Sequence, residues 1–167
     1  MNNKHNESNK KIIAPLAETE DLIRETVKSG GEFRLITAGV SMKPLLRNRK
    51  DTVVLVKAPA HLKRFDIPLY KRKDGQFVLH RVISCDKEGY VMCGDNQLIK
   101  EYGITDSDVI AVVSKIIRNG KTIDLQKSFS YKIYVFFYCR LFWIRKLWLR
   151  VCSVLRRIFS KIKRKEI

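Results

Sequence analysis

Between residues 32 and 125 the chain alternates short β-prone segments with turn-forming residues, and this alternation constrains the fold more than any other feature of the sequence. The segments are rich in β-branched or aromatic residues and occupy 33–36, 52–57, 67–71, 76–84, 90–92 and 109–118. Turn signals at 73–76, 87–89 and 118–121 separate them, and the last joins 109–118 to 122–125 as a hairpin. The pattern predicts a mostly-β domain over residues 31–125.

The segment before this domain, residues 1–30, is predicted to be a polar lead-in followed by one short helix. Residues 1–11 are polar, and no apolar run long enough for a secretory signal or an N-terminal anchor follows them. From 15 to 28, Leu16, Leu22, Ile23 and Val27 recur near helical spacing, and two glycines at 30–31 end the pattern. We expect this amphipathic helix to pack against the domain.

Positive charge is concentrated in the last part of the chain, residues 126–167. The whole chain has a formal charge of +17, and from Tyr131 onward eleven Lys and Arg stand against one acid. Residues 133–155 are apolar-rich but contain Arg140, Arg145, Lys146 and Arg150. Four central charges cost roughly 12 kcal/mol on an insertion scale, while the apolar residues return only about 5 kcal/mol, so a spanning helix is disfavoured.

A helical wheel over residues 133–162 places most apolar side chains on one broad face and most basic ones opposite. We interpret residues 131–165 as an amphipathic helix that lies on an anionic membrane surface. The alternative is a helix that packs on the domain or on an oligomer partner. Nucleic acid is not an expected partner, because the aromatic residues lie on the apolar face and do not interleave with the basic ones.

The four cysteines, Cys85, Cys93, Cys139 and Cys152, show no spacing typical of a metal site. Cys85 and Cys93 flank a predicted turn, so a cross-strand disulfide between them is conceivable. Buried or incidental thiols are the simpler interpretation.

Three segments carry residues suited to nucleophilic catalysis. Ser41 follows Gly39 and Val40 and precedes Met42 and Pro44. The glycine allows close approach of a substrate backbone, and the proline fixes the chain after the serine. His80 lies in a strand-like run, and Asp95 lies in a Gly-Asp-Asn turn after the next strand. Each residue alone is ordinary, but together Ser, His and Asp supply a nucleophile, a base and a carboxylate that can orient the base.

The three segments resemble the conserved boxes of signal peptidase I enzymes. GVSMKPLL is similar to the box that carries the nucleophile, and LHRVI and GDN are similar to the second and third boxes. KDTVVLV and FDIPLYKR are similar to the paired strands between the first two boxes, although both lack the glycine before the aspartate. The resemblance covers about residues 33–118. It implies the coiled antiparallel β-sheet domain that this group shares with LexA-type self-cleaving repressors.

The resemblance also implies roles for individual residues. A histidine at position 80, where bacterial members have a lysine base, places the chain with the endoplasmic-reticulum and archaeal subgroup. Asp95 matches the aspartate of the third box, and Glu101 stands where this subgroup often has a second acidic residue. Gly39 replaces a hydroxyl residue that helps to bind the oxyanion in several bacterial members. The implied oxyanion hole therefore consists of the backbone N–H groups of Val40 and Ser41.

The sequence thus predicts a membrane-associated serine endopeptidase without cofactor or metal, cleaving a peptide or protein precursor through an acyl-enzyme on Ser41. Two other classes stay open. A self-cleaving regulator would need a cleavable segment of its own, and the lead-in has no Ala-Gly or Cys-Gly site. A catalytically silent binding or accessory module would have no need of the Ser41 and His80 pair. The basic tail favours the cytoplasmic face of a membrane, with the opposite face left open.

Overall fold

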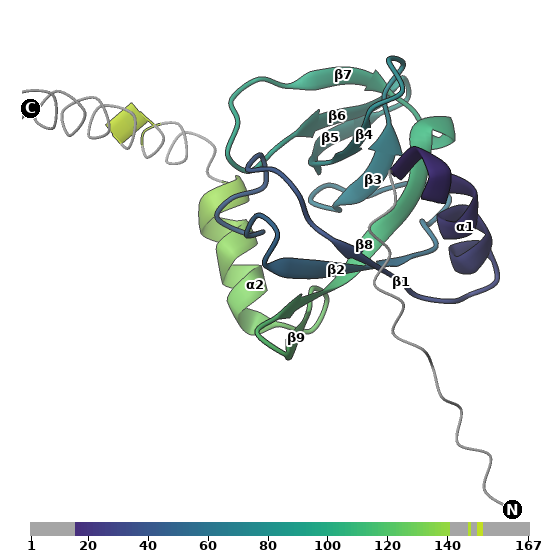
Figure 1. Cartoon of the computed structure of the whole chain (residues 1–167). Helices are drawn as coiled ribbons and strands as arrows, with labels where there is room; N and C mark the ends of the chain where they lie inside the picture. Colours follow the sequence, from purple (N-terminus) through teal and green to yellow (C-terminus); the bar gives the residue numbers. More distant parts are fainter. Residues whose placement is uncertain (1–15, 141–146, 148–149, 152–167) are drawn as a thin grey trace, which may run out of the picture.

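The computed structural model describes residues 16–140 together with residues 147, 150 and 151. The predicted polar lead-in up to residue 15, Cys152 and most of the predicted membrane helix lie outside this range. The described chain is mostly β, as predicted, with a curled antiparallel sheet shaped as a half-barrel, a helix near each end, and a second, smaller sheet (Figure 1).

The large sheet has six antiparallel strands in the order β1-β2-β8-β3-β4, with β9 paired to β8. Its strands are β1 (Phe33–Ile36), β2 (Asp51–Val56), β3 (Pro68–Lys71), β4 (Phe77–Leu79), β8 (Val109–Arg118) and β9 (Lys121–Asp124). The predicted β8–β9 hairpin is confirmed. Its turn places Asn119 and Gly120 at positive φ, the conformation that an Asn-Gly hairpin turn requires.

The small sheet consists of β5 (Arg81–Asp86), β6 (Gly89–Cys93) and β7 (Glu101–Ile104). The prediction of one strand over residues 76–84 is wrong, because the chain leaves the large sheet after Leu79 and enters the small sheet at Arg81. His80 is the residue between the two sheets. Strand β7 and the short 3₁₀ turn η1 (Asp106–Asp108) were not predicted, because neither has an apolar run.

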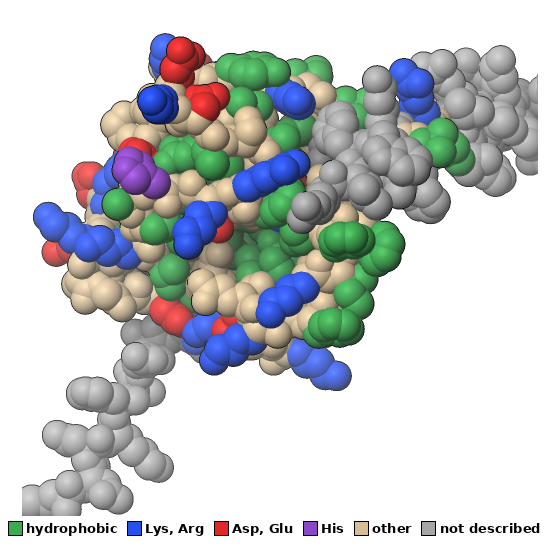
Figure 2. All heavy atoms as spheres, turned by 180° about the vertical axis from the view of Figure 1, so that it is seen from behind, with side chains coloured by type: hydrophobic (Ala, Val, Ile, Leu, Met, Phe, Trp, Pro, Cys, Tyr) green, Lys and Arg blue, Asp and Glu red, His purple; other side chains and the backbone are tan. Residues whose placement is uncertain are grey.

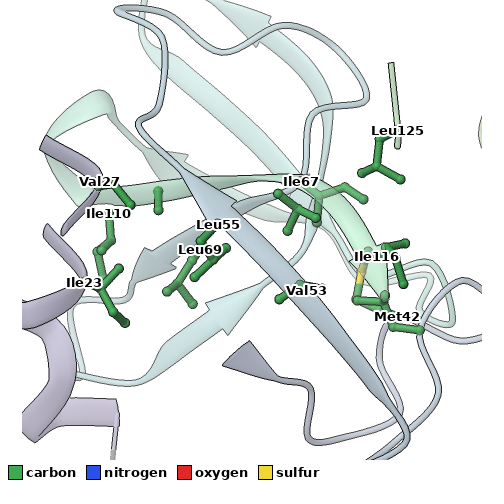
Figure 3. Packing of buried hydrophobic residues seen from close by; sticks show 13 residues of the cluster. Ile23, Val27, Met42, Val53, Leu55, Ile67, Leu69, Ile110, Ile116 and Leu125 are labelled. Carbon is green, nitrogen blue, oxygen red and sulfur yellow. The ribbon is translucent and has the colours of Figure 1, made fainter. Parts of the chain in front are cut away.

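The described residues form two apolar cores. Helix α1 (Leu16–Lys28) places Ile23 and Val27 against the large sheet, where they meet Leu69 and Ile110 (Figure 3). This confirms the expected packing of the short amphipathic helix. The second core joins the two sheets: Tyr70 and Val109 of the large sheet pack with residues of the small sheet and with Leu62. The residues from the small sheet are Val82, Tyr90, Met92 and Ile104.

After β9 the chain forms helix α2 (Phe129–Tyr134), which continues as a wider helical turn, η2 (Val135–Arg140). The Ser128 side chain caps α2 by accepting a hydrogen bond from the Tyr131 N–H. Tyr131, Tyr134 and Tyr138 form a stack, and hydrogen bonds tie all three to the domain. The start of the predicted membrane helix therefore packs on the domain, which is the alternative that the sequence left open.

The described residues contain no helix that is both long and apolar enough to span a bilayer. The conceivable disulfide is not formed, since Cys85 and Cys93 are both free thiols. In the β5–β6 register, Cys85 stands opposite Tyr90 and Cys93 stands opposite Arg81, which keeps the two cysteines at different places along the sheet.

Candidate active site

Ser41 lies in the loop between β1 and β2, and two buried side chains that follow it fix this loop. Met42 and Leu46 are 5% and 3% exposed and belong to the core of the large sheet. Gly39 has a φ of +97°, which a residue with a side chain rarely adopts, and its N–H donates to Asn48 Oδ1 over 2.9 Å. The predicted structural roles of Gly39 and Met42 agree with this geometry, and Pro44 follows a cis peptide bond in the same loop.

The buried carboxylate of Asp51, at the start of β2, holds the far end of the loop. It accepts hydrogen bonds from the backbone N–H and the guanidinium of Arg47 and from Arg118 on β8. Burial alone would raise the pKa of Asp51, but the bonds from Arg118 and Arg47 outweigh it and lower the pKa to about 2. The carboxylate therefore stays ionised, and the loop that carries Ser41 stays attached to the sheet.

His80 is 2% exposed and is held through one ring nitrogen. Its Nδ1 lies 2.9 Å from Glu101 Oε1 and 3.3 Å from the Tyr70 hydroxyl. Glu101 opens strand β7, opposite Met92 of β6. With Nδ1 engaged by a carboxylate, Nε2 is the nitrogen left to accept a proton, which is the tautomer that a general base needs.

Glu101 is itself fixed by two residues of β3 and the turn after it. The Tyr70 hydroxyl donates to Glu101 Oε2 over 2.9 Å, and Arg72 donates to both carboxylate oxygens, with Nε 2.8 Å from Oε2. Burial raises the pKa of Glu101, and the bonds from Arg72 and Tyr70 more than offset this, so the pKa lies below its ordinary value. The carboxylate stays charged beside His80.

Burial is the largest influence on His80 and lowers its pKa below 6.5. The charge of Glu101 acts in the opposite direction, and the charge of Arg72 adds to the lowering. The imidazole is therefore neutral at neutral pH, as a general base must be.

Ser41 and His80 meet at Gly94, the residue that follows β6. A Cβ atom built on Gly94 would stand 2.7 Å from the Ser41 carbonyl oxygen and 3.1 Å from His80 Nε2. The Ser41 carbonyl also accepts the Asn96 N–H over 2.7 Å. Among the described residues the Ser41 hydroxyl makes no hydrogen bond to His80, but the residue and the ring nitrogen surround the same point. The structure therefore brings the backbone of Ser41 and the imidazole of His80 against the same glycine.

Gly94→Ala is expected to lower activity at least about 10-fold, because a contact of 2.7 Å to a backbone atom forces the Ser41 loop or His80 to move. Gly120→Ala is the control. Nothing lies within 4 Å of the Cβ position of Gly120, so the added methyl group meets no neighbour. Because Gly120 has a positive φ, this variant measures the effect of backbone strain at a position away from the site. Turnover of a cleaved peptide measures the effect. Equal activity of the two variants would contradict the close approach at Gly94.

Asp95 does not have the role that the sequence assigned to it. Its carboxylate makes a two-pronged ion pair with Arg81, through Nε–Oδ1 at 2.8 Å and Nη2–Oδ2 at 2.7 Å, and neither side chain is exposed to solvent. The Tyr134 hydroxyl donates to Asp95 Oδ2 as well. The prediction of Asp95 as the carboxylate that orients His80 is therefore wrong, and Glu101 occupies that place.

The predicted oxyanion hole is compatible with the structure. Within residues 16–140, neither the Val40 N–H nor the Ser41 N–H has a hydrogen-bond acceptor. Val40 is 52% exposed, so a ligand can reach this stretch of backbone. Two unpaired N–H groups next to a nucleophile are the donors that a tetrahedral oxyanion requires.

Tyr70 and Arg72 belong to the site and were not predicted. Tyr70 lies in β3 and Arg72 directly follows it, and a spacing of two residues in extended chain puts both side chains on one side, which was a usable signal. Which face that is depends on the pairing of β3 with β4 and on the position of β7. In the described part of the chain, no group of three or more His, Cys, Asp or Glu side chains is arranged to hold a metal ion.

Comparison with models of known protein families found no match, and comparison with curated protein sequences found none either.

Proposed function

We propose that the protein is a serine endopeptidase of the signal-peptidase type, with Ser41 as nucleophile, His80 as general base and Glu101 as the carboxylate that orients His80. The observation that carries this proposal is the approach of Ser41 and His80 Nε2 around Gly94, with Nδ1 of the same ring fixed by Glu101.

In this mechanism, Ser41 Oγ attacks the carbonyl carbon of the peptide bond while His80 Nε2 takes the hydroxyl proton. The tetrahedral oxyanion binds the Val40 and Ser41 N–H groups. As the C–N bond breaks, His80 returns the proton to the leaving amine, which leaves an ester on Ser41. Water then attacks the ester, with His80 again as base. Glu101 stabilises the imidazolium at both stages, and no cofactor takes part.

The substrate class is a peptide or protein precursor, so the proposal is tested by looking for peptide cleavage. Full-length protein is incubated with a library of proteome-derived peptides, and new peptide termini are identified by mass spectrometry. The proposal expects a recurring sequence pattern at termini made by the wild type and none made by Ser41→Ala. Termini that are the same in both samples, or absent from both, would refute it.

Glu101→Gln tests the orienting role. We expect kcat to fall by on the order of 10²-fold to 10⁴-fold, because a neutral amide neither fixes the tautomer nor stabilises the imidazolium. In the wild type, activity is lost as pH falls through the lowered pKa of His80, since only the neutral ring accepts a proton. Because Glu101 raises that pKa, its removal moves the acidic limb of the pH profile of kcat/KM to still lower pH.

Glu88→Gln, the same change at an exposed position, is the control for this experiment and leaves both quantities unchanged. A Glu101→Gln profile that overlays the wild type would show that Glu101 does not act on His80.

We infer in addition that residues 131–165 bring the protein to an anionic membrane surface, with the cytoplasmic face favoured. Their basic charge supports this, as does the outer side of α2 and η2, where Ile133, Phe136 and Phe137 are 44–57% exposed. Leu147 and Val151, further along the chain, are 59% and 43% exposed.

A further inference from the structure

A hollow of about 710 Å³ lies between α2 and the segment that joins β2 to β3, away from Ser41 and His80. Figure 2 looks into a hollow with a hydrophobic floor and Lys and Arg side chains around it. The floor is formed by Ile67, Val112, Val113 and Leu125 from the sheet and the chain after it. The volume is in the range of sites that bind small organic ligands.

The rim of the hollow is basic. Lys57, Lys63, Arg64 and Lys132 line it, against a single acid, Asp66. The carboxylate of Asp66 accepts the backbone N–H of Lys63, so it is already engaged with the chain itself. An apolar interior below a ring of cations selects a ligand with an apolar body and an anionic end.

The apolar lining continues out of the hollow along α2 and η2. Val135 and Phe136 form one wall, and Phe136 is half exposed beside Ile133 and Phe137. A ligand that enters the hollow therefore passes along an exposed apolar side of the helix. This continuity fits a flexible hydrocarbon chain better than a compact ligand, which would need an enclosed cavity.

We propose that this hollow binds the acyl chain of an anionic lipid, with the lipid headgroup on Lys63 and Lys132 at the rim. The proposal deepens the membrane association proposed above and does not depend on the chemistry at Ser41. Tyr131 connects the two regions: it lines the hollow, and its hydroxyl accepts a hydrogen bond from Arg81 Nη1 over 2.9 Å. The bound chain would thus lie against the same helix that supports the Arg81–Asp95 pair.

The test uses full-length protein and a fluorescent long-chain fatty acid below its critical micelle concentration, so that no bilayer is present. The Lys63→Glu/Lys132→Glu variant is expected to bind the fatty acid at least about tenfold more weakly, since each basic residue attracts an anionic headgroup. Val135→Trp, which fills the hollow, is expected to weaken binding by a similar factor. A fatty alcohol of the same length, which lacks the charge, binds the wild type more weakly than the acid.

The matched control is Lys87→Glu/Lys121→Glu, which makes the same charge change at exposed positions outside the hollow. It is expected to bind as the wild type does. Unfolding midpoints establish that each variant is folded, and the rim variant changes only exposed side chains. Equal affinity in the wild type, the rim variant and the filled variant would overturn the proposal. Retained pelleting with anionic vesicles in that case would leave the association through the tail standing.

Discussion

Ser41→Ala is expected to lower kcat by a factor on the order of 10⁶, and His80→Ala by a similar factor, a size taken from another serine peptidase in which these groups act as a unit. Without the hydroxyl no acyl-enzyme forms, and without the imidazole the hydroxyl keeps its proton. What remains is the catalysis supplied by binding and by the backbone donors of the oxyanion hole.

The double variant Ser41→Ala/His80→Ala distinguishes a catalytic pair from two separate contributions. Because each residue is useless without the other, the double variant is expected to be no slower than either single variant. Single-turnover cleavage of a peptide found in the library measures all three. Ser84→Ala, at an exposed position on β5, is the control and keeps wild-type activity. Losses that multiply in the double variant would contradict the pairing of Ser41 with His80.

Asp95→Asn is expected to destabilise the fold by about 3–5 kcal/mol, which is the usual cost of breaking a buried ion pair from one side. The change leaves the Arg81 guanidinium charged, with its ion-pair partner neutralised, in a place where neither side chain contacts solvent. In the wild type, burial lowers the pKa of Arg81 and the charge of Asp95 more than offsets this. A guanidinium does not lose its proton inside proteins, so Arg81 stays charged in the variant. Chemical denaturation, read at the unfolding midpoint, measures the loss.

Two further variants complete this test. Asp21→Asn, the same change on the exposed side of α1, is expected to alter stability by less than about 0.5 kcal/mol. Arg81→Met/Asp95→Leu, which removes both charges, is expected to be more stable than Asp95→Asn. Wild-type stability of Asp95→Asn would contradict the structural role of the Arg81–Asp95 pair, and a loss confined to kcat and the pH profile would assign Asp95 to His80.

The sequence predicted those parts of the fold that depend on local chemistry. The β8–β9 hairpin follows from Asn119-Gly120, and the packing of α1 follows from the spacing of Ile23 and Val27. Strand β7 was missed because Glu101–Ile104 has one buried apolar residue, Ile104, and gains its place from pairing with β6. Long-range pairing of this kind leaves little trace in a short segment.

The sequence predicted Ser41 and His80 as the central residues of the site but assigned the orienting role to the wrong carboxylate, Asp95 in place of Glu101. Asp95 lies in the Gly-Asp-Asn turn that resembles the third box, so its place in the sequence favours it as the orienting residue. The structure instead pairs it with Arg81, and neither side chain of this pair is exposed to solvent. Glu101 reaches His80 because β7 pairs with β6. This pairing cannot be predicted from the local sequence pattern of either strand.

The tail shows the same limit. The periodicity of its apolar and basic residues indicated a helix on a membrane surface. The spacing of Tyr131, Tyr134 and Tyr138, which indicates packing on the domain, was not considered. These residues are three and four apart, so they share one side of a helix, and that side docks on Arg81 and Asp95. Polar aromatic rings need a partner for the hydroxyl when buried, and here the domain supplies it.

Covalent capture of the nucleophile tests the role of Ser41 directly. Full-length protein is treated with a phosphonylating reagent that reacts with activated serines, and the modified residue is located by mass spectrometry of peptide fragments. We expect one adduct on Ser41, much slower labelling of His80→Ala and Glu101→Gln, and no adduct in Ser41→Ala. Labelling of another serine, or labelling of Ser41 that is equally fast without His80, would contradict this expectation.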